Sequence, residues 1–229
     1  IEDARQAERE ERDRLATLRE NLPGVLERIG VPFAWRDARF QGCIDLPSNL
    51  VDRARTWAAQ PAGMLLLCGA AGSGKTFVAV SILAEVLAAG LMYPEKAAFV
   101  GERELLDGVK AGFNGDGPGR ESELMRRAKA AELLVLDDLA STRLTSWGAA
   151  EVAGVIEQRF ARGLALVVTS NLDLPGLADT IDPRVTSRLG AFGNAWSFPA
   201  KDLRMAGRIK SVFRRLGGPH ALSLDQRRS

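Results

Sequence analysis

Short apolar runs alternate along the chain with longer stretches in which apolar residues recur at helical spacing. The runs cover residues 64–68, 97–100, 133–136 and 164–169, and each is apolar along nearly its whole length. Uninterrupted apolar runs of this length are typical of strands buried on both faces by helices. The pattern therefore predicts an α/β fold with a parallel sheet between two helical layers.

The stretches between these runs predict the helices. Their expected ranges are 50–60, 77–89, 102–112, 121–131, 146–162 and 182–190. Ser48 or Asn49 is expected to cap the first of them, because both can accept a hydrogen bond from a free backbone N–H group. The glycine-rich residues 113–119 predict a loop, and 196–198 predict a last strand.

The first 35 residues have a different pattern. Residues 2–20 are rich in Glu and Arg, which predicts a solvated helix with ion pairs four residues apart. Leucines then recur at helical spacing from Leu15 to Leu26, with an interruption at Pro23-Gly24. We expect residues 1–35 to form a helical arm that docks on the chain's own core or on a partner. A core over 36–204 and a basic tail over 205–229 complete the expected organisation.

The net charge of +2 is unevenly distributed. Residues 1–60 carry 10 basic and 11 acidic side chains, residues 61–180 carry 11 and 15, and residues 181–229 carry 10 and 3. The basic residues 181–229 indicate either a segment that binds a polyanionic partner or a solvated tail without a partner.

Cys43 and Cys68 are too few for a disulfide framework or a zinc site. No signal-peptide pattern or membrane-length apolar run is present, so we expect a cytoplasmic protein without membrane association.

Residues 69–76 read Gly-Ala-Ala-Gly-Ser-Gly-Lys-Thr, between a predicted buried strand and a predicted helix. Glycines in such a loop let backbone N–H groups approach phosphate oxygens. Lys75 can reach the β- and γ-phosphates, and Thr76 offers a hydroxyl to Mg²⁺. The sequence therefore predicts an ATP and Mg²⁺ site. Its nucleotide-contacting residues are expected to be Gly69, Ala70, Ala71, Gly72, Ser73, Gly74, Lys75, Thr76 and Phe77.

Two carboxylates, Asp137 and Asp138, follow the apolar run 133–136. Ligands of open α/β sheets bind at the carboxyl ends of the strands. Asp137 is expected to hold Mg²⁺, directly or through water, and Asp138 to orient or deprotonate an attacking water. The alternative is that both acids simply lie where the strand leaves the core.

Thr169-Ser-Asn171 ends the next apolar run. The Asn171 amide could detect the γ-phosphate and position the water, although Ser-Asn after a strand is also a turn signal. Arg184 and Arg188 are four residues apart and therefore share one face of a predicted helix. An arginine that reaches a neighbouring subunit's γ-phosphate stabilises the charge that develops in phosphoryl transfer. The alternative is that Arg184 and Arg188 are exposed to solvent and have no role in phosphoryl transfer.

The order of these motifs resembles that of the AAA+ ATPases, and in particular the DnaC-type helicase loaders and the IstB-type transposition helper ATPases. The resemblance covers about residues 36–204 and includes Arg39-Phe40, Glu104-Leu-Leu and Lys201-Asp-Leu-Arg204. The stretch Arg184-Val-Thr-Ser-Arg-Leu189 is its most discriminating part. Asp138 stands where the family often has Glu. No convincing helical lid with its own sensor arginine is found, which helicase loaders also commonly lack.

The resemblance implies roles for four further positions. Arg188 matches the arginine finger that acts in trans, and Arg184 matches the box arginine of initiator-type ATPases. Lys110 and Phe113 match positions that contact single-stranded DNA on the inner surface of a helical assembly. The alternative for Phe113 is a core aromatic at the end of a helix.

The leading hypothesis is an ATP-dependent loader of the hexameric replicative helicase, which assembles head to tail on single-stranded DNA and is released by hydrolysis. A transposition helper on double-stranded DNA, a monomeric small-molecule kinase and a nucleotide-switched clamp with little turnover stay open. The sequence leaves undecided the cellular, phage or mobile-element origin, the subunit count, the DNA polarity, the adenine pocket and any partner-binding segment upstream of Ile1.

Overall fold

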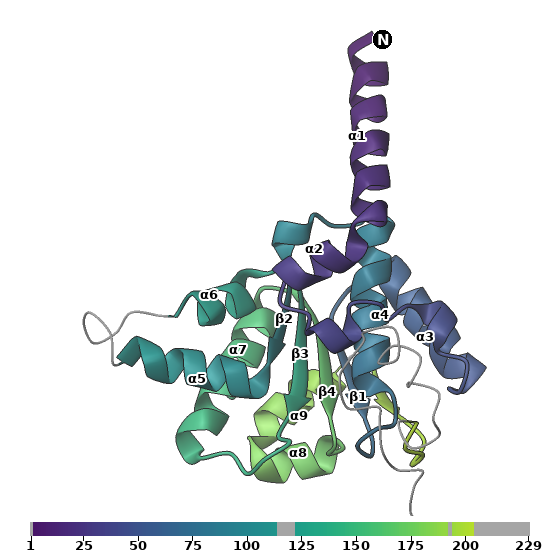
Figure 1. Ribbon diagram of the computed structural model, residues 1–229. Helices are drawn as coiled ribbons and strands as arrows, with labels where there is room; N and C mark the ends of the chain where they lie inside the picture. The colour runs from purple at the N-terminus through teal and green to yellow at the C-terminus, as the bar shows by residue number, and fades with distance from the viewer. Residues whose placement is uncertain (1, 114–121, 192–193, 204–229) are drawn as a thin grey trace, which may run out of the picture.

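Five parallel strands form a single sheet in the computed structural model, which describes residues 2–113, 122–191 and 194–203 (Figure 1). The strand order is β2-β3-β4-β1-β5, so the chain crosses over between neighbours through helices. This arrangement confirms the predicted α/β fold with a parallel sheet. The strands are β1 Met64–Cys68, β2 Ala97–Gly101, β3 Leu133–Leu139, β4 Ala165–Ser170 and β5 Ala195–Ser197.

Helices cover both faces of the sheet and make it the middle of three layers. Successive strand residues point to opposite faces, so Leu65 and Leu67 pack with one layer while Leu66 packs with the other. The first layer contains α2 Leu22–Arg28, α3 Ser48–Ala59 and α4 Lys75–Ala88. The second contains α5 Glu102–Phe113, α6 Glu123–Ala130, α7 Ser146–Ala161, α8 Leu174–Thr180 and α9 Pro183–Gly190. Three short 3₁₀ helices cover Phe33–Trp35, Phe40–Gly42 and Pro94–Lys96.

Helix α1, Glu2–Glu20, projects from this core as a long arm (Figure 1). Only its last turns touch the core. Leu18 is buried there, Arg19 Nε donates to the Ala88 carbonyl at 2.7 Å, and the Arg14 guanidinium lies 4.3 Å from the centre of the Tyr93 ring. The arm is thus anchored on the C-terminal end of α4, while residues 5–10 are exposed.

Three local predictions need correction. The N-cap of α3 is Pro47, and neither Ser48 nor Asn49 caps the helix, because the helix already begins at Ser48. The helical arm is interrupted at Asn21, between α1 and α2, two residues before the expected Pro23-Gly24, which lies in the first turn of α2, where a proline's missing N–H group has no partner to lose. Residues 174–180 form α8, which is absent from the expected helices, with the Asp173 side chain accepting a hydrogen bond from the Gly176 N–H group at 3.0 Å.

Several predictions fall outside the described residues: the loop at 114–119, the basic tail 205–229 and the side chain of Phe113. After β5, the described chain runs to Leu203 without a further helix, so no lid is present among the described residues. None of the helices in the described ranges has the length and apolar character that a membrane span requires.

Candidate nucleotide site

The loop between β1 and α4 is shaped by glycines in the left-handed region. Gly72 has a φ of 79° and Gly74, the N-cap of α4, a φ of 98°. Only glycine adopts such angles without strain. A Cβ atom at Gly72 would also collide with the carboxylate of Asp202, which lies against the loop. The loop therefore turns tightly and ends on the N-terminus of a helix, where free N–H groups favour an anion.

Lys75 is held at the centre of this loop. Its ammonium group donates to the carbonyl oxygens of Gly69 and Ala70 at 2.8 and 2.9 Å and to Asn171 Oδ1 at 3.0 Å. Only 5% of the residue is exposed. The hydrogen bond to Asn171 joins the first residue of α4 to the residue that follows β4. It brings together two predicted site residues that are 96 positions apart.

Asp137 is the second centre of the site. Its Oδ1 atom accepts hydrogen bonds from Thr76 Oγ1 at 2.9 Å and from Thr169 Oγ1 at 2.6 Å. Burial raises the pKa of the Asp137 carboxyl from 3.8 to about 6. The hydrogen bond from Thr169 acts in the opposite direction, and the nearby charge of Asp138 raises the pKa further. The hydrogen bond of Thr169 to Asp137 could not be predicted from the sequence, because a threonine in an apolar strand is usually interpreted as a packing residue.

These side chains face one cavity of about 280 Å³. Its wall contains predicted residues from the phosphate loop, β3 and β4: Ala71, Gly72, Gly74, Lys75, Thr76, Phe77, Asp137, Asp138 and Asn171. Trp35 completes the wall and was not predicted, since nothing in its local sequence marks it. Two apolar residues that precede β1 do not line this cavity: Phe40 is buried, and Ile44 is 74% exposed.

The residues present fit a magnesium triphosphate. Thr76 and Asp137 offer a hydroxyl and a carboxylate to the same space, and Mg²⁺ prefers oxygen ligands of this kind. Ser73 is fully buried in the phosphate loop, and its hydroxyl has no hydrogen-bond partner among the described residues. A buried polar group without a partner is costly, so a ligand that supplies one is favoured. Mg²⁺ bound with ATP would neutralise part of the triphosphate charge.

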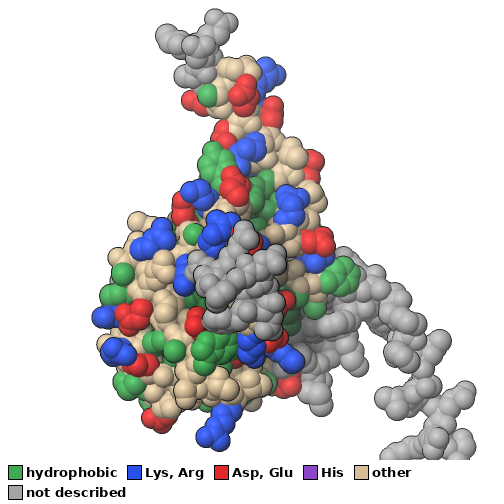
Figure 2. All heavy atoms as spheres, turned by 90° about the vertical axis from the view of Figure 1, so that its left-hand side faces the viewer, with side chains coloured by type: hydrophobic (Ala, Val, Ile, Leu, Met, Phe, Trp, Pro, Cys, Tyr) green, Lys and Arg blue, Asp and Glu red, His purple; other side chains and the backbone are tan. Residues whose placement is uncertain are grey.

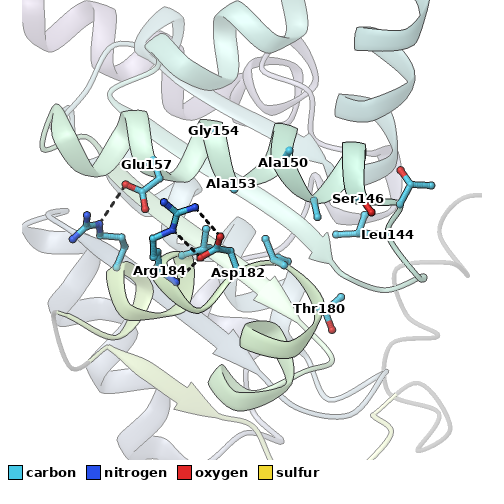
Figure 3. Close-up of a pocket in the computed structure, with 14 residues that line it drawn as sticks. Leu144, Ser146, Ala150, Ala153, Gly154, Glu157, Thr180, Asp182 and Arg184 are labelled. Carbon is cyan, nitrogen blue, oxygen red and sulfur yellow. Dashed lines mark hydrogen bonds and ion pairs between the residues drawn. The ribbon is translucent and has the colours of Figure 1, made fainter.

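Arg184 and Arg188 do not line this cavity. They lie on α9 beside a separate groove of about 670 Å³ between α7 and the α8–α9 region (Figure 3). Arg184 is 83% exposed and pairs with Asp182 at 3.0 Å. Arg188 is 41% exposed, lies 3.4 Å from Glu157 Oε2 and stacks 4.5 Å from the centre of the Phe160 ring. Both arginines are thus on an outer surface, away from the nucleotide cavity of their own chain.

Lys110 lies on α5 and lines neither the nucleotide cavity nor the groove. It is exposed, 3.7 Å from Asp107, and 5.9 Å from the centre of the Trp147 ring. Phe113 is the last residue of α5. The predicted residues therefore form three separate sets: the cavity, the arginine surface and the end of α5.

A phosphate loop that opens a helix, a carboxylate pair at the end of β3 and a polar side chain at the end of β4 define a P-loop ATPase of the AAA+ class. A family model described as IstB-like ATP binding protein matches residues 34–187. The chain therefore belongs to the family of IstB-like ATP-binding proteins, which are AAA+ ATPases of the DnaC and IstB type. Among curated proteins, none matches the chain.

Solved structures share the fold at low sequence identity. The DnaC helicase loader has a TM-score of 0.60 at 19% identity, over 73% of this chain and 98% of that one. Domain III of the Thermotoga maritima replication initiation protein DnaA has a TM-score of 0.64 at 19% identity, over 79% and 74%. The replication initiator DnaA bound to AMPPCP and single-stranded DNA has a TM-score of 0.58 at 15% identity, over 74% and 52%.

Proposed function

We propose that this ATPase loads the replicative DNA helicase: it assembles head to tail on single-stranded DNA when ATP is bound and is released by hydrolysis. The observation that carries the proposal is the separation of Arg188 from the nucleotide cavity. Arg188 is partly exposed on α9 and lines a different groove from the one that Lys75 and Asp137 face. An arginine in that position is available to the site of the next subunit.

The chain's own residues divide the chemistry among them. Lys75 and the loop N–H groups bind the β- and γ-phosphates, and Thr76 and Asp137 hold Mg²⁺. Asp138 accepts a proton from the attacking water, or orients it, and Asn171 positions that water beside the γ-phosphate. Arg188 of the neighbouring subunit stabilises the developing negative charge, and Arg184 contacts the same nucleotide from α9. A site completed by the next subunit makes assembly depend on ATP and makes the contact head to tail.

Single-stranded DNA binds at the end of α5. The face that carries α5 and α6 is turned to the viewer in Figure 2, and basic side chains are interspersed with acidic ones on it. Lys110 is exposed there and can pair with a phosphate. Phe113 supplies a ring on which a base can stack. A replication initiator DnaA of the same fold has been solved with single-stranded DNA, which supports single-stranded DNA as the partner.

The arm α1 is the proposed contact to the helicase. Its residues 5–10 are exposed and rich in charged side chains, while its last turns are fixed to α4. A rigid arm that leaves the core can engage a partner without disturbing the nucleotide site. The similarity of the fold to that of the DnaC helicase loader favours this partner.

The second candidate is a helper that assembles on double-stranded DNA and recruits a transposase. The family model described as IstB-like ATP binding protein favours it, because the match covers residues 34–187, most of the ATPase core. The motifs of the core serve both functions equally.

Two experiments test the proposal. In the first, labelled ATP is titrated into the protein and into Lys75→Ala, with Lys96→Ala as an exposed lysine control. Loss of about 3 kcal/mol of charge-assisted hydrogen bonding predicts at least about 100-fold weaker binding for Lys75→Ala alone. Equal binding by all three proteins contradicts the nucleotide site.

In the second, the full chain is mixed with the replicative helicase and single-stranded DNA, with and without ATP, and is followed by size-exclusion chromatography. ATP-dependent co-elution with the helicase supports the loader. ATP-dependent filaments on double-stranded DNA that retain a transposase, with no helicase complex, support the helper instead.

A further inference from the structure

The turn that follows Asp137 has an unusual backbone. Asp138 has a φ of 58° and Ala140 a φ of 55°, and they are the two non-glycine residues in the left-handed region among the described ones. Such residues cost on the order of 1 kcal/mol each and persist where their surroundings hold them. The Asp138 carboxylate lines the nucleotide cavity. The shape of this turn therefore determines where that carboxylate points.

Strand β4 holds the first part of the turn. The Asp138 N–H group donates to Thr169 Oγ1 at 2.9 Å, and Ser170 Oγ donates to the Leu139 carbonyl at 2.7 Å. Both contacts come from the strand beside β3. They leave the second left-handed residue, Ala140, without a hydrogen bond from β4.

Glu102 supplies the remaining contact. It is the first residue of α5, directly after β2, and its Oε2 atom accepts a short hydrogen bond from the Ala140 N–H group. Only 4% of Glu102 is exposed. Its burial raises the pKa of the carboxyl, the hydrogen bond from Ala140 lowers it, and the charge of Asp138 raises it.

A carboxylate at position 102 is energetically unfavourable for two reasons. Burial penalises its charge, and the neighbouring Asp138 repels it. An apolar side chain would avoid both costs but would leave the buried N–H group of Ala140 without its acceptor. The hydrogen bond to Ala140 is the contact that offsets these costs, and it acts on the turn that carries Asp138.

We infer that Glu102 is a positioning residue for Asp138: its buried side chain, reaching over from α5, fixes the left-handed turn and thereby the direction of the carboxylate that activates water. This inference rests on the proposed ATPase chemistry of Asp138. Glu102 does not line the cavity, so it acts through the backbone rather than on the nucleotide.

The kinetic test compares Glu102→Ala, which removes the acceptor, with Glu102→Gln, which keeps an acceptor oxygen. Glu104→Gln, on the same helix but exposed, is the control. A misdirected carboxylate lowers turnover without loosening ATP, so we expect kcat to fall about 10- to 100-fold in Glu102→Ala with KM unchanged. Glu102→Gln should recover most of the loss. In an Asp138→Ala background, Glu102→Ala should have no further effect on kcat, because the two residues act as a unit.

A second readout does not need turnover. Hydrogen exchange of the Ala140 amide should become at least about 10-fold faster in Glu102→Ala and stay slow in Glu102→Gln, with the Val135 amide of β3 unchanged in both. An Ala140 amide that stays protected in Glu102→Ala overturns the inference, as does an equal fall in kcat with and without Asp138. If wild type binds ATP but does not hydrolyse it, the proposed function fails, while the exchange result still decides whether Glu102 holds the turn.

Discussion

Thr76 and Asp137 are 61 positions apart and share a hydrogen bond of 2.9 Å across the nucleotide cavity. The bond joins the first turn of α4 to the end of β3. It places a hydroxyl and a carboxylate where one cation can contact both. The elements that carry these two residues pack against each other through the apolar layer between α4 and the sheet, so the site depends on the fold of the core.

The raised pKa of Asp137 predicts a stability that falls as the pH rises. Between pH 4 and about 6 the folded protein keeps a proton that the unfolded chain, with a pKa near 3.8, has lost. The free energy of unfolding should therefore decrease by up to roughly 3 kcal/mol over this range through Asp137. Urea unfolding at several pH values in the presence of EDTA measures it. The free energy of unfolding should decrease with pH more steeply in wild type than in Asp137→Asn. Parallel curves of this free energy against pH for the two proteins would contradict the prediction.

Replacing Asp138 should separate binding from hydrolysis. Asp138→Asn cannot accept a proton, so kcat should fall about 10²- to 10⁴-fold while the Kd for ATP changes little. Single-turnover hydrolysis and a binding titration measure the two quantities. A large rise in turnover for Asp138→Glu would favour the alternative of a nucleotide-switched clamp, whereas a small change fits a working ATPase.

The predicted DNA contact at α5 can be tested by the dependence of DNA affinity on salt concentration. Lys110→Ala should weaken binding to single-stranded DNA and reduce the slope of log K against log salt by about 1, because one phosphate contact is lost. Fluorescence anisotropy with an oligonucleotide at several salt concentrations measures both. Lys96→Ala, which removes an exposed lysine paired with Glu132, is the matched control. Identical slopes for the two variants would remove Lys110 from the DNA contact.

Arg159 is fully buried away from the nucleotide cavity, so we expect its replacement to lower the stability of the fold without acting directly on the nucleotide. Arg159 donates to the Ala128 carbonyl at 2.7 Å and to the Ala165 carbonyl at 2.5 Å, and no carboxylate pairs with it among the described residues. Arg159→Met would remove both of these buried hydrogen bonds, so the free energy of unfolding should fall by about 2–4 kcal/mol. Arg162→Met, on the exposed end of the same helix, should cost less than about 0.5 kcal/mol. Denaturant unfolding measures both, and equal losses would contradict the role given to Arg159.

The sequence predicted the layers of the fold because each buried strand is apolar on both faces. It missed α8, since Leu174-Pro175-Gly176 contains two residues that usually break helices, although Asp173 was an available cap signal. At the site, the phosphate loop and the two aspartates could be predicted because their chemistry is local. Thr169, Trp35 and Glu102 could not, because their roles arise only where separate elements of the fold meet.

The position of Arg188 outside the nucleotide cavity of its own chain could not be predicted from the sequence either. Spacing placed Arg184 and Arg188 on one helix face, but only the fold shows that this face is outside the nucleotide cavity. Arg188 contacts Glu157 and Phe160 on α7, which is separated from α9 in the chain by one strand, β4, and one helix, α8.

The most direct measurement mixes two inactive variants. Arg188→Ala keeps its nucleotide site but offers no arginine to its neighbour, whereas Lys75→Ala offers Arg188 but holds no ATP of its own. If each triphosphate is bound by one subunit and completed by the next, ATPase activity should reappear on mixing, well above the sum of the separate proteins. A mixture that stays as inactive as its components would contradict a shared site and favour a subunit that works alone.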